Sequence, residues 1–244
     1  MANSMVQAVD DSFKRNPDRA ISGASLQFPD VLVATLACLG ASVATGVLGF
    51  LFFPPSLVLY IGLMVGLLIF GVVLARKSPV KPLAALSYSA ALGVLVGAFT
   101  NSAVYSGGSL ALIPQAIVGT LGGVAAVLIV YSTPFGQKAA KATKFFTIAV
   151  LGYLIIAVLS FGSSLLGFTG SWGFYGQGLL GIILCMIGVT LAAWSLLVNI
   201  DFSRNLVDYS ADQNWKWSVG MSISSSIVWM YIEILRLLSI VGSD

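Results

Sequence analysis

The sequence predicts an all-α fold, a polytopic membrane protein built as a bundle of seven transmembrane helices. Three observations lead to this prediction. Of the 244 residues 58% are hydrophobic, and only 9% are charged, against roughly 25% in an ordinary soluble domain. No Asp or Glu occurs between Val31 and Ile200, as expected of helices in lipid, where a charge at mid-span costs about 2.5–3.5 kcal/mol.

Seven apolar runs are each long enough to cross about 30 Å of hydrocarbon as a helix. Asp30 directly precedes the first run and can cap that helix, because its carboxylate accepts hydrogen bonds from unpaired backbone N–H groups. The runs comprise residues 31–53, 57–74, 83–100, 110–131, 145–166, 178–200 and 219–241.

Positive charge alternates between the connections, which fixes the expected orientation. The first, third and fifth connections contain no Lys or Arg. The other three contain Arg76, Lys77 and Lys81, then Lys138, Lys141 and Lys144, then Arg204 and Lys216. By the positive-inside rule the N-terminus is cytoplasmic and the C-terminus is outside. We expect a multi-pass protein of the cell inner (plasma) membrane, and topology accounts for these cations without a nucleic-acid partner.

The first thirty residues are polar, with three cations and four acids, and lack the apolar core and cleavage site of a signal peptide. We interpret residues 1–30 as a cytoplasmic N-terminal arm and residues 31–244 as one seven-helix transmembrane domain. Cys38 and Cys185 lie within apolar runs and are expected to be small buried side chains.

Glu233 is the only acid well inside an apolar run, which makes it the leading functional candidate. Three interpretations compete. Arg236 lies three residues further on the same helix face and can hide both charges in a local pair. Alternatively, Glu233 is a proton-titrating site, because burial disfavours its charged form and a nearby cation favours it. The third interpretation is a calcium site, since carboxylate and carbonyl oxygens are the ligands of calcium.

Asp201, at the end of the sixth run, is the candidate second carboxylate, and two neighbouring acids share a proton over some pH range. A solvated helix end is the simpler interpretation of Asp201, and Arg204 is its candidate partner. The predicted boundaries separate Asp201 from Glu233 by about 20 Å along the helix axis. For the two to meet, the sixth helix must extend past Asp201, or the seventh must begin later than residue 219.

The end of the chain resembles a known family. Asp201 and Phe202, together with the segment WMYIEILRLL at residues 229–238, are similar to the ending of the Bax inhibitor-1 (TMBIM, YccA-like) family, in particular its bacterial branch. The connection RKSPV at residues 76–80 also resembles that family. The sequence departs from the family pattern in having Glu at position 233, a longer connection between the two acids, and no firm counterpart of a latch arginine.

The resemblance implies a bundle with the seventh helix at its centre and a pH-sensitive calcium leak channel. It implies that Asp201 and Glu233 form a proton-sensing, cation-binding pair, with calcium as the bound or transported ion. Arg76 is the nearest candidate for the latch, and Arg204 and Arg236 are further candidate charge partners. The implied partners are the lipid bilayer, protons, and calcium or another cation, and no resident cofactor is expected.

Other classes of function are narrowed by composition. The chain has no histidine, which excludes Ser–His dyads and imidazole metal sites, and no lysine lies within a run to form a Schiff base. We therefore expect no enzyme. Two alternatives remain: a proton/cation-coupled transporter, and a non-transporting regulatory or structural partner of a membrane protease or a larger membrane complex.

Overall fold

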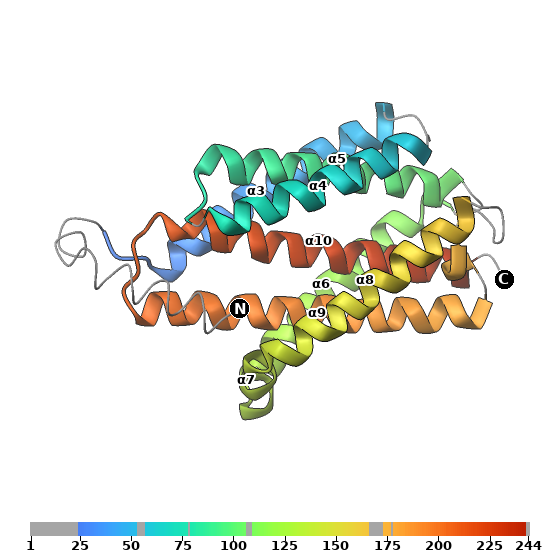
Figure 1. The fold of residues 1–244 in the computed structure, drawn as a ribbon. Helices are drawn as coiled ribbons and strands as arrows, with labels where there is room; N and C mark the ends of the chain where they lie inside the picture. Colours follow the sequence, from blue (N-terminus) through green and yellow to red (C-terminus); the bar gives the residue numbers. More distant parts are fainter. Residues whose placement is uncertain are drawn as a thin grey trace. The chain divides into compact units, whose positions relative to one another are not determined.

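The computed structural model describes residues 24–52, 57–77, 79–105, 109–165, 173–176 and 178–242. These residues fold almost entirely into α-helices (Figure 1). The elements are α3 (Phe28–Phe52), α4 (Leu57–Arg76), α5 (Pro82–Tyr105), α6 (Leu112–Tyr131), α7 (Pro134–Lys141), α8 (Thr143–Leu165), the 3-10 helix η1 (Gly173–Gly176), α9 (Gly178–Asp208) and α10 (Trp215–Val241).

Within the described part, six helices are long and apolar enough to cross a membrane: α3, α5, α6, α8, α9 and α10. Helix α4 has 20 residues and contributes the shorter apolar stretch Gly62–Leu74. Large apolar side chains such as Leu36 (58% exposed) and Val118 (68% exposed) lie on the outside, where lipid replaces water as their surroundings. The protein is therefore a multi-pass helical membrane protein, and the count of seven spans stays a prediction.

The helix boundaries agree with the sequence to within a few residues at most ends. There are three larger differences: α5 continues to Tyr105 instead of ending at residue 100, α9 continues to Asp208 instead of ending at residue 200, and α10 begins at Trp215 instead of residue 219. Helix α7 was not predicted. Most of the predicted N-terminal arm, residues 1–23, lies outside the described residues, as does Ser78 of the connection at 76–80.

Asp30 caps α3 from within its first turn. The helix begins at Phe28, so Asp30 is its third residue, and the carboxylate accepts a hydrogen bond from the Gln27 N–H at 3.2 Å. This is the reciprocal half of a capping box, in which an acid at the third position reaches back to the chain before the helix. The side-chain amide of Gln213 donates to the other carboxylate oxygen at 2.9 Å, which ties α3 to the connection before α10.

The chain divides into two compact units. The first comprises the chain up to Ala98 together with Val198–Ser225, and the second comprises Phe99–Leu197 together with the chain from Ser226. Helices α5, α9 and α10 each contribute one segment to the first unit and one to the second.

In the first unit, α3 and α5 approach to backbone contact. The hydroxyl of Ser42 donates to the Ser89 carbonyl at 2.8 Å, and that of Thr45 donates to the Ala90 carbonyl at 2.7 Å. A Cβ atom at Gly97 would collide with the Gly46 carbonyl. Small residues at four-residue intervals allow this approach in a setting where no hydrophobic force pulls helices together.

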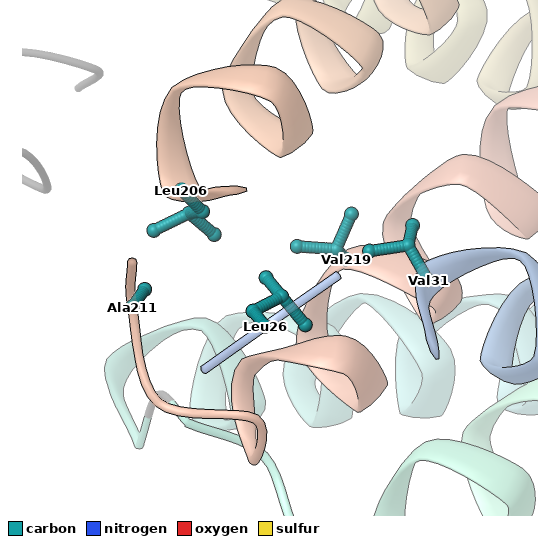
Figure 2. Close-up of a cluster of buried hydrophobic side chains, with 5 residues drawn as sticks. All are labelled: Leu26, Val31, Leu206, Ala211 and Val219. Carbon is teal, nitrogen blue, oxygen red and sulfur yellow. The ribbon is translucent and has the colours of Figure 1, made fainter. Parts of the chain in front are cut away.

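The first unit also contains an apolar cluster that packs around the connection between α9 and α10 (Figure 2). The N–H of Leu26 donates to the Ala211 carbonyl at 2.8 Å, in a short antiparallel bridge between the segment before α3 and the segment before α10. Leu26 is 2% exposed, and its side chain lies among the other members of the cluster in Figure 2. The cluster comprises Leu26, Val31, Leu206, Ala211 and Val219.

In the second unit, α9 and α10 lie side by side with contacts that recur every seven residues (Figure 1). Gly181 contacts Ile240, Gly188 contacts Glu233, and the hydroxyls of Ser195 and Ser226 lie 2.8 Å apart. A seven-residue repeat is the spacing at which two helices keep the same faces in contact. The two helices thus pack as an antiparallel pair with the acid in their seam.

Helix α10 has neighbours on several sides within each unit. In the second unit the Tyr231 hydroxyl lies 3.2 Å from that of Thr100 on α5, and Met230 occupies the space beside Gly123 on α6. In the first unit Gly220 contacts Ala34 on α3, and Ser218 accepts a hydrogen bond from the N–H of Val80 before α5 at 2.8 Å. Helix α10 thus contacts α5 and α6 in the second unit and α3 in the first, and the central position of the last helix in the whole bundle stays a prediction.

Candidate functional site

The site is built around the carboxylate of Glu233, which is 2% exposed on α10 in the second unit. Three side-chain donors surround it. The Tyr153 hydroxyl donates to Oε1 at 2.8 Å, the Trp229 indole N–H donates to Oε1 at 3.0 Å, and the Arg236 guanidinium donates to Oε2 at 3.0 Å. The set matches an ionised carboxylate, which accepts hydrogen bonds and has none to donate.

Local helix geometry supplies two of the three donors. Trp229, Glu233 and Arg236 are spaced by four and three residues, so all three side chains lie on one face of α10. Arg236 and Glu233 form an ion pair in which the side chains are 17% and 3% exposed. Of the three interpretations of Glu233, the local ion pair is therefore formed in the structure.

The remaining donor and the wall of the site come from other helices. Tyr153 on α8 is 8% exposed, and its ring lies 6.1 Å from that of Trp229. Gly188 on α9 faces both groups: a Cβ atom at this position would lie 2.5 Å from the Tyr153 hydroxyl oxygen and 2.6 Å from Oε2 of Glu233. Only a residue without a side chain fits at position 188 while the carboxylate keeps its position.

Aromatic rings hold the far side of the Arg236 guanidinium. Its central carbon lies 4.3 Å from the centroid of the Tyr175 ring and 5.3 Å from that of Phe99. Both distances are in the range of a cation–π interaction. Tyr175 belongs to η1, which is fixed to α8 by a hydrogen bond of 2.8 Å from the Phe174 N–H to the Ser160 hydroxyl. Burial raises the pKa of Tyr175, so its ring stays neutral beside the cation.

Asp201, the other acid of the predicted pair, lies on α9 in the first unit and is partly exposed. The side-chain amide of Asn205 donates to it at 3.2 Å. Helix α9 extends past Asp201, which meets one of the two conditions set by the sequence, whereas α10 begins earlier and not later than residue 219. The pairing of Asp201 with Glu233 stays a prediction.

The other two candidate charge partners are in exposed positions of the first unit. Arg204 forms an ion pair of 3.7 Å with Asp208, and the two side chains are 51% and 62% exposed. Arg76 is exposed at the end of α4. Its assignment as a latch stays a prediction.

Sequence reasoning missed most of the groups that surround the pair formed by Glu233 and Arg236. Trp229 was available from its spacing of four residues before Glu233. Tyr153, Gly188 and Tyr175 are 80, 45 and 58 residues away along the chain, and no local pattern connects them with the acid. Both cysteines are buried, as predicted.

A resident metal has no obvious ligand set in the part of the chain that the structure describes. No group of three or more Cys, Asp or Glu side chains lies close enough together there to hold a metal ion.

Fold and site together define a multi-pass helical membrane protein with a buried carboxylate–guanidinium centre on its last helix. Residues 5–243 match the family model described as Bax inhibitor 1 like. The match covers nearly the whole chain, and the protein belongs to this family. No curated protein matches the chain significantly.

Proposed function

We propose that the protein is a pH-sensitive leak pathway for calcium or a similar cation, controlled by protonation of Glu233 together with Asp201. The observation that carries this proposal is a buried carboxylate in a membrane helix, held by side-chain donors from α8 and α10. Ionisable groups within spans are expensive and mark ion or proton pathways. Membership of the Bax inhibitor 1 like family supports the same class of activity.

The proposed switch is a change in the protonation state of Glu233, the partner of Arg236. An ionised Glu233 accepts from Tyr153, Trp229 and Arg236. A protonated carboxyl is no longer attracted to the guanidinium as an anion is. It also carries an O–H group that faces three other donors, so the contacts of α10 must rearrange. Arg236 then keeps only its aromatic contacts with Phe99 and Tyr175. The site thus has two arrangements, which is what a gate requires.

Asp201 has a second role in the proposal, as the acid that shares the proton. It lies on α9, and α9 also carries Gly188 against the Glu233 carboxylate. A change at either acid therefore acts on the same helix. We further propose that the N-terminus is cytoplasmic, because the connections alternate in positive charge. The proposal of a bacterial inner (plasma) membrane rests on the resemblance of residues 229–238 to the bacterial branch of the family.

The test is calcium flux into proteoliposomes across a pH series, read by a trapped calcium-sensitive dye. The native chain is compared with Glu233→Gln and Asp201→Asn, and Asp208→Asn serves as the matched control because Asp208 is an exposed acid on the same helix as Asp201. We expect pH-dependent flux in the native chain and in the control, and flux that no longer responds to pH in Glu233→Gln. Equal flux at every pH in all four proteins rejects the proposal.

One observation favours a second function, that of a non-transporting structural or regulatory partner of a membrane complex. The Glu233 carboxylate is fully engaged by neutral donors and by Arg236, as expected of a pair that only stabilises the helix. In that case Glu233→Gln lowers stability, and neither the native chain nor the variant conducts calcium. Absence of flux from folded native protein therefore selects this function over the leak pathway.

A further inference from the structure

Helix α7 forms a small, separately anchored platform between α6 and α8, shown in olive green in Figure 1. Pro134 occupies its first turn, and the Thr133 hydroxyl accepts a hydrogen bond from the Gly136 N–H at 3.2 Å. Proline and threonine are favoured residues at these positions, because one lacks an N–H and the other satisfies one. The eight residues therefore form a capped helix, where a bare connection would suffice to join two spans.

One face of α7 is fixed to the rest of the second unit. Gly136 and Ala140 are buried, and a Cβ atom at Gly136 would collide with the Val130 carbonyl at the end of α6. On the other side, the Trp194 indole of α9 donates to the Ala139 carbonyl at 2.9 Å. These contacts hold the helix at both α6 and α9, so the direction of its opposite face is determined.

The opposite face of α7 and the first turn of α8 together carry cations flanked by aromatic rings. Lys138, Lys141 and Lys144 recur every three residues and are exposed. Phe135 and Phe145, at the two ends of the stretch, are 75% and 73% exposed. An amphipathic helix with lysine on its polar side and exposed phenylalanine beside it is typical of segments that lie in the headgroup region of a bilayer.

These three cations lack counter-ions in the part of the chain that the structure describes. The sequence has no acid between Val31 and Ile200, and the ion pairs found among the described residues involve other cations. A basic cluster next to a membrane helix is attracted to anionic lipid, at about 1 kcal/mol for each Lys near the surface.

We propose that α7 and the first turn of α8 form a binding surface for the headgroups of anionic phospholipids. The three lysines contact the phosphate groups, and Phe135 and Phe145 enter the boundary with the acyl chains. The positive-inside rule explains the side of the membrane on which the lysines lie. That rule does not require the lysines to lie on a capped helix that packs against α6 and α9. A binding site for lipid headgroups explains this arrangement.

The test places a photoreactive benzoylphenylalanine at Phe135 in the full-length protein, reconstituted in discs with equal amounts of phosphatidylglycerol and phosphatidylcholine. Mass spectrometry then identifies the cross-linked lipid. The matched reporter replaces Leu83, which is 80% exposed at the start of α5 beside a second basic connection. Two triple variants are compared. The test variant combines Lys138→Gln, Lys141→Gln and Lys144→Gln, and the control charge variant combines Arg76→Gln, Lys77→Gln and Lys81→Gln.

We expect the reporter at position 135 to capture phosphatidylglycerol in preference, and the reporter at position 83 to capture the lipids nearer to their bulk ratio. Substituting the α7 lysines should weaken the preference by about fivefold per lysine. Arginine at the same three positions should keep it, as should the control charge variant. Lys141→Gln alone provides the same test if the triple variant fails to fold.

Three outcomes overturn the proposal. The first is capture at position 135 in the bulk ratio of the two lipids. The second is a preference that survives removal of the α7 lysines, and the third is a preference abolished by inorganic phosphate at physiological ionic strength, which assigns the site to a free anion.

Discussion

The two compact units solve the problem of helix association in different ways. In the first unit, α3 and α5 meet through Gly46, Gly93 and Gly97, and hydroxyl groups donate to neutral backbone carbonyls. In the second unit, α8, α9 and α10 surround a buried carboxylate with a guanidinium beside it. Since α3 and α5 pack closely with no buried charge among the described residues of the first unit, packing alone does not explain the acid in the second. The difference is the reason to assign a function to Glu233.

The strongest way to break this comparison is to remove the anion. Glu233→Leu leaves the Arg236 guanidinium in a poorly solvated position without its partner, and loss of one member of a buried pair costs about 3–5 kcal/mol. We expect this loss in the free energy of unfolding, measured by SDS titration in mixed micelles. Adding Arg236→Met should recover most of it, because the unpaired charge is then gone. Equal losses in the single and double variants would show that the pair contributes only through packing.

The corresponding change in the first unit is Gly97→Ala. The added methyl group would collide with backbone atoms of Gly46 and Phe50, so α3 and α5 must separate. We expect the free energy of unfolding, measured by the same SDS titration, to fall by about 3 kcal/mol, at the upper end of the usual range for overpacking. The control is Gly62→Ala on α4, where nothing lies within 4 Å of the added atom and helix propensity predicts a gain of up to about 1 kcal/mol. A tolerated alanine at position 97 would contradict the backbone contact.

A matched pair of hydroxyl deletions sharpens the contrast between neutral and charged acceptors. Tyr153→Phe removes a donor to the Glu233 carboxylate in the second unit, and Tyr60→Phe removes a donor to the Ala98 carbonyl in the first unit, where that bond is 2.7 Å long. Hydrogen bonds to charged groups contribute about 1.5–3 kcal/mol and neutral ones about 1 kcal/mol. We expect Tyr153→Phe to be the more destabilising in thermal unfolding in detergent. The reverse order would mean that Tyr153 donates to a neutral carboxyl.

The smallest effect is expected at the exposed ion pair of the first unit. Asp208→Asn removes the partner of Arg204, and both side chains are more than half exposed. Exposed pairs contribute about 0–1 kcal/mol, and salt screens them further. Unfolding titrations at low and high salt should therefore differ little between this variant and the native chain. A loss comparable with that of Glu233→Leu would remove the distinction between the two pairs.

The sequence by itself determined the membrane class and most of the helices. Long apolar runs bounded by polar connections have one stable form in lipid, the helix, because its backbone groups are paired within one segment. Glu233 was found in the same way, since a charge in an apolar run needs no structure to be noticed. Its pairing with Arg236 was predicted from their spacing of three residues, and the ion pair of 3.0 Å between the two side chains confirms it.

Only the tertiary structure decided what surrounds the acid and how the connections are built. Tyr153 and Gly188 reach Glu233 from other helices, and Tyr175 reaches Arg236 from η1. Contacts between distant residues leave no periodic trace in a sequence. Helix α7 was missed because its eight residues are too few to show a helical period, and its stability comes from Thr133 and from contacts with α6 and α9. Local patterns are set by backbone geometry within a few residues, whereas a site is set by packing between helices, and only folding brings those helices together.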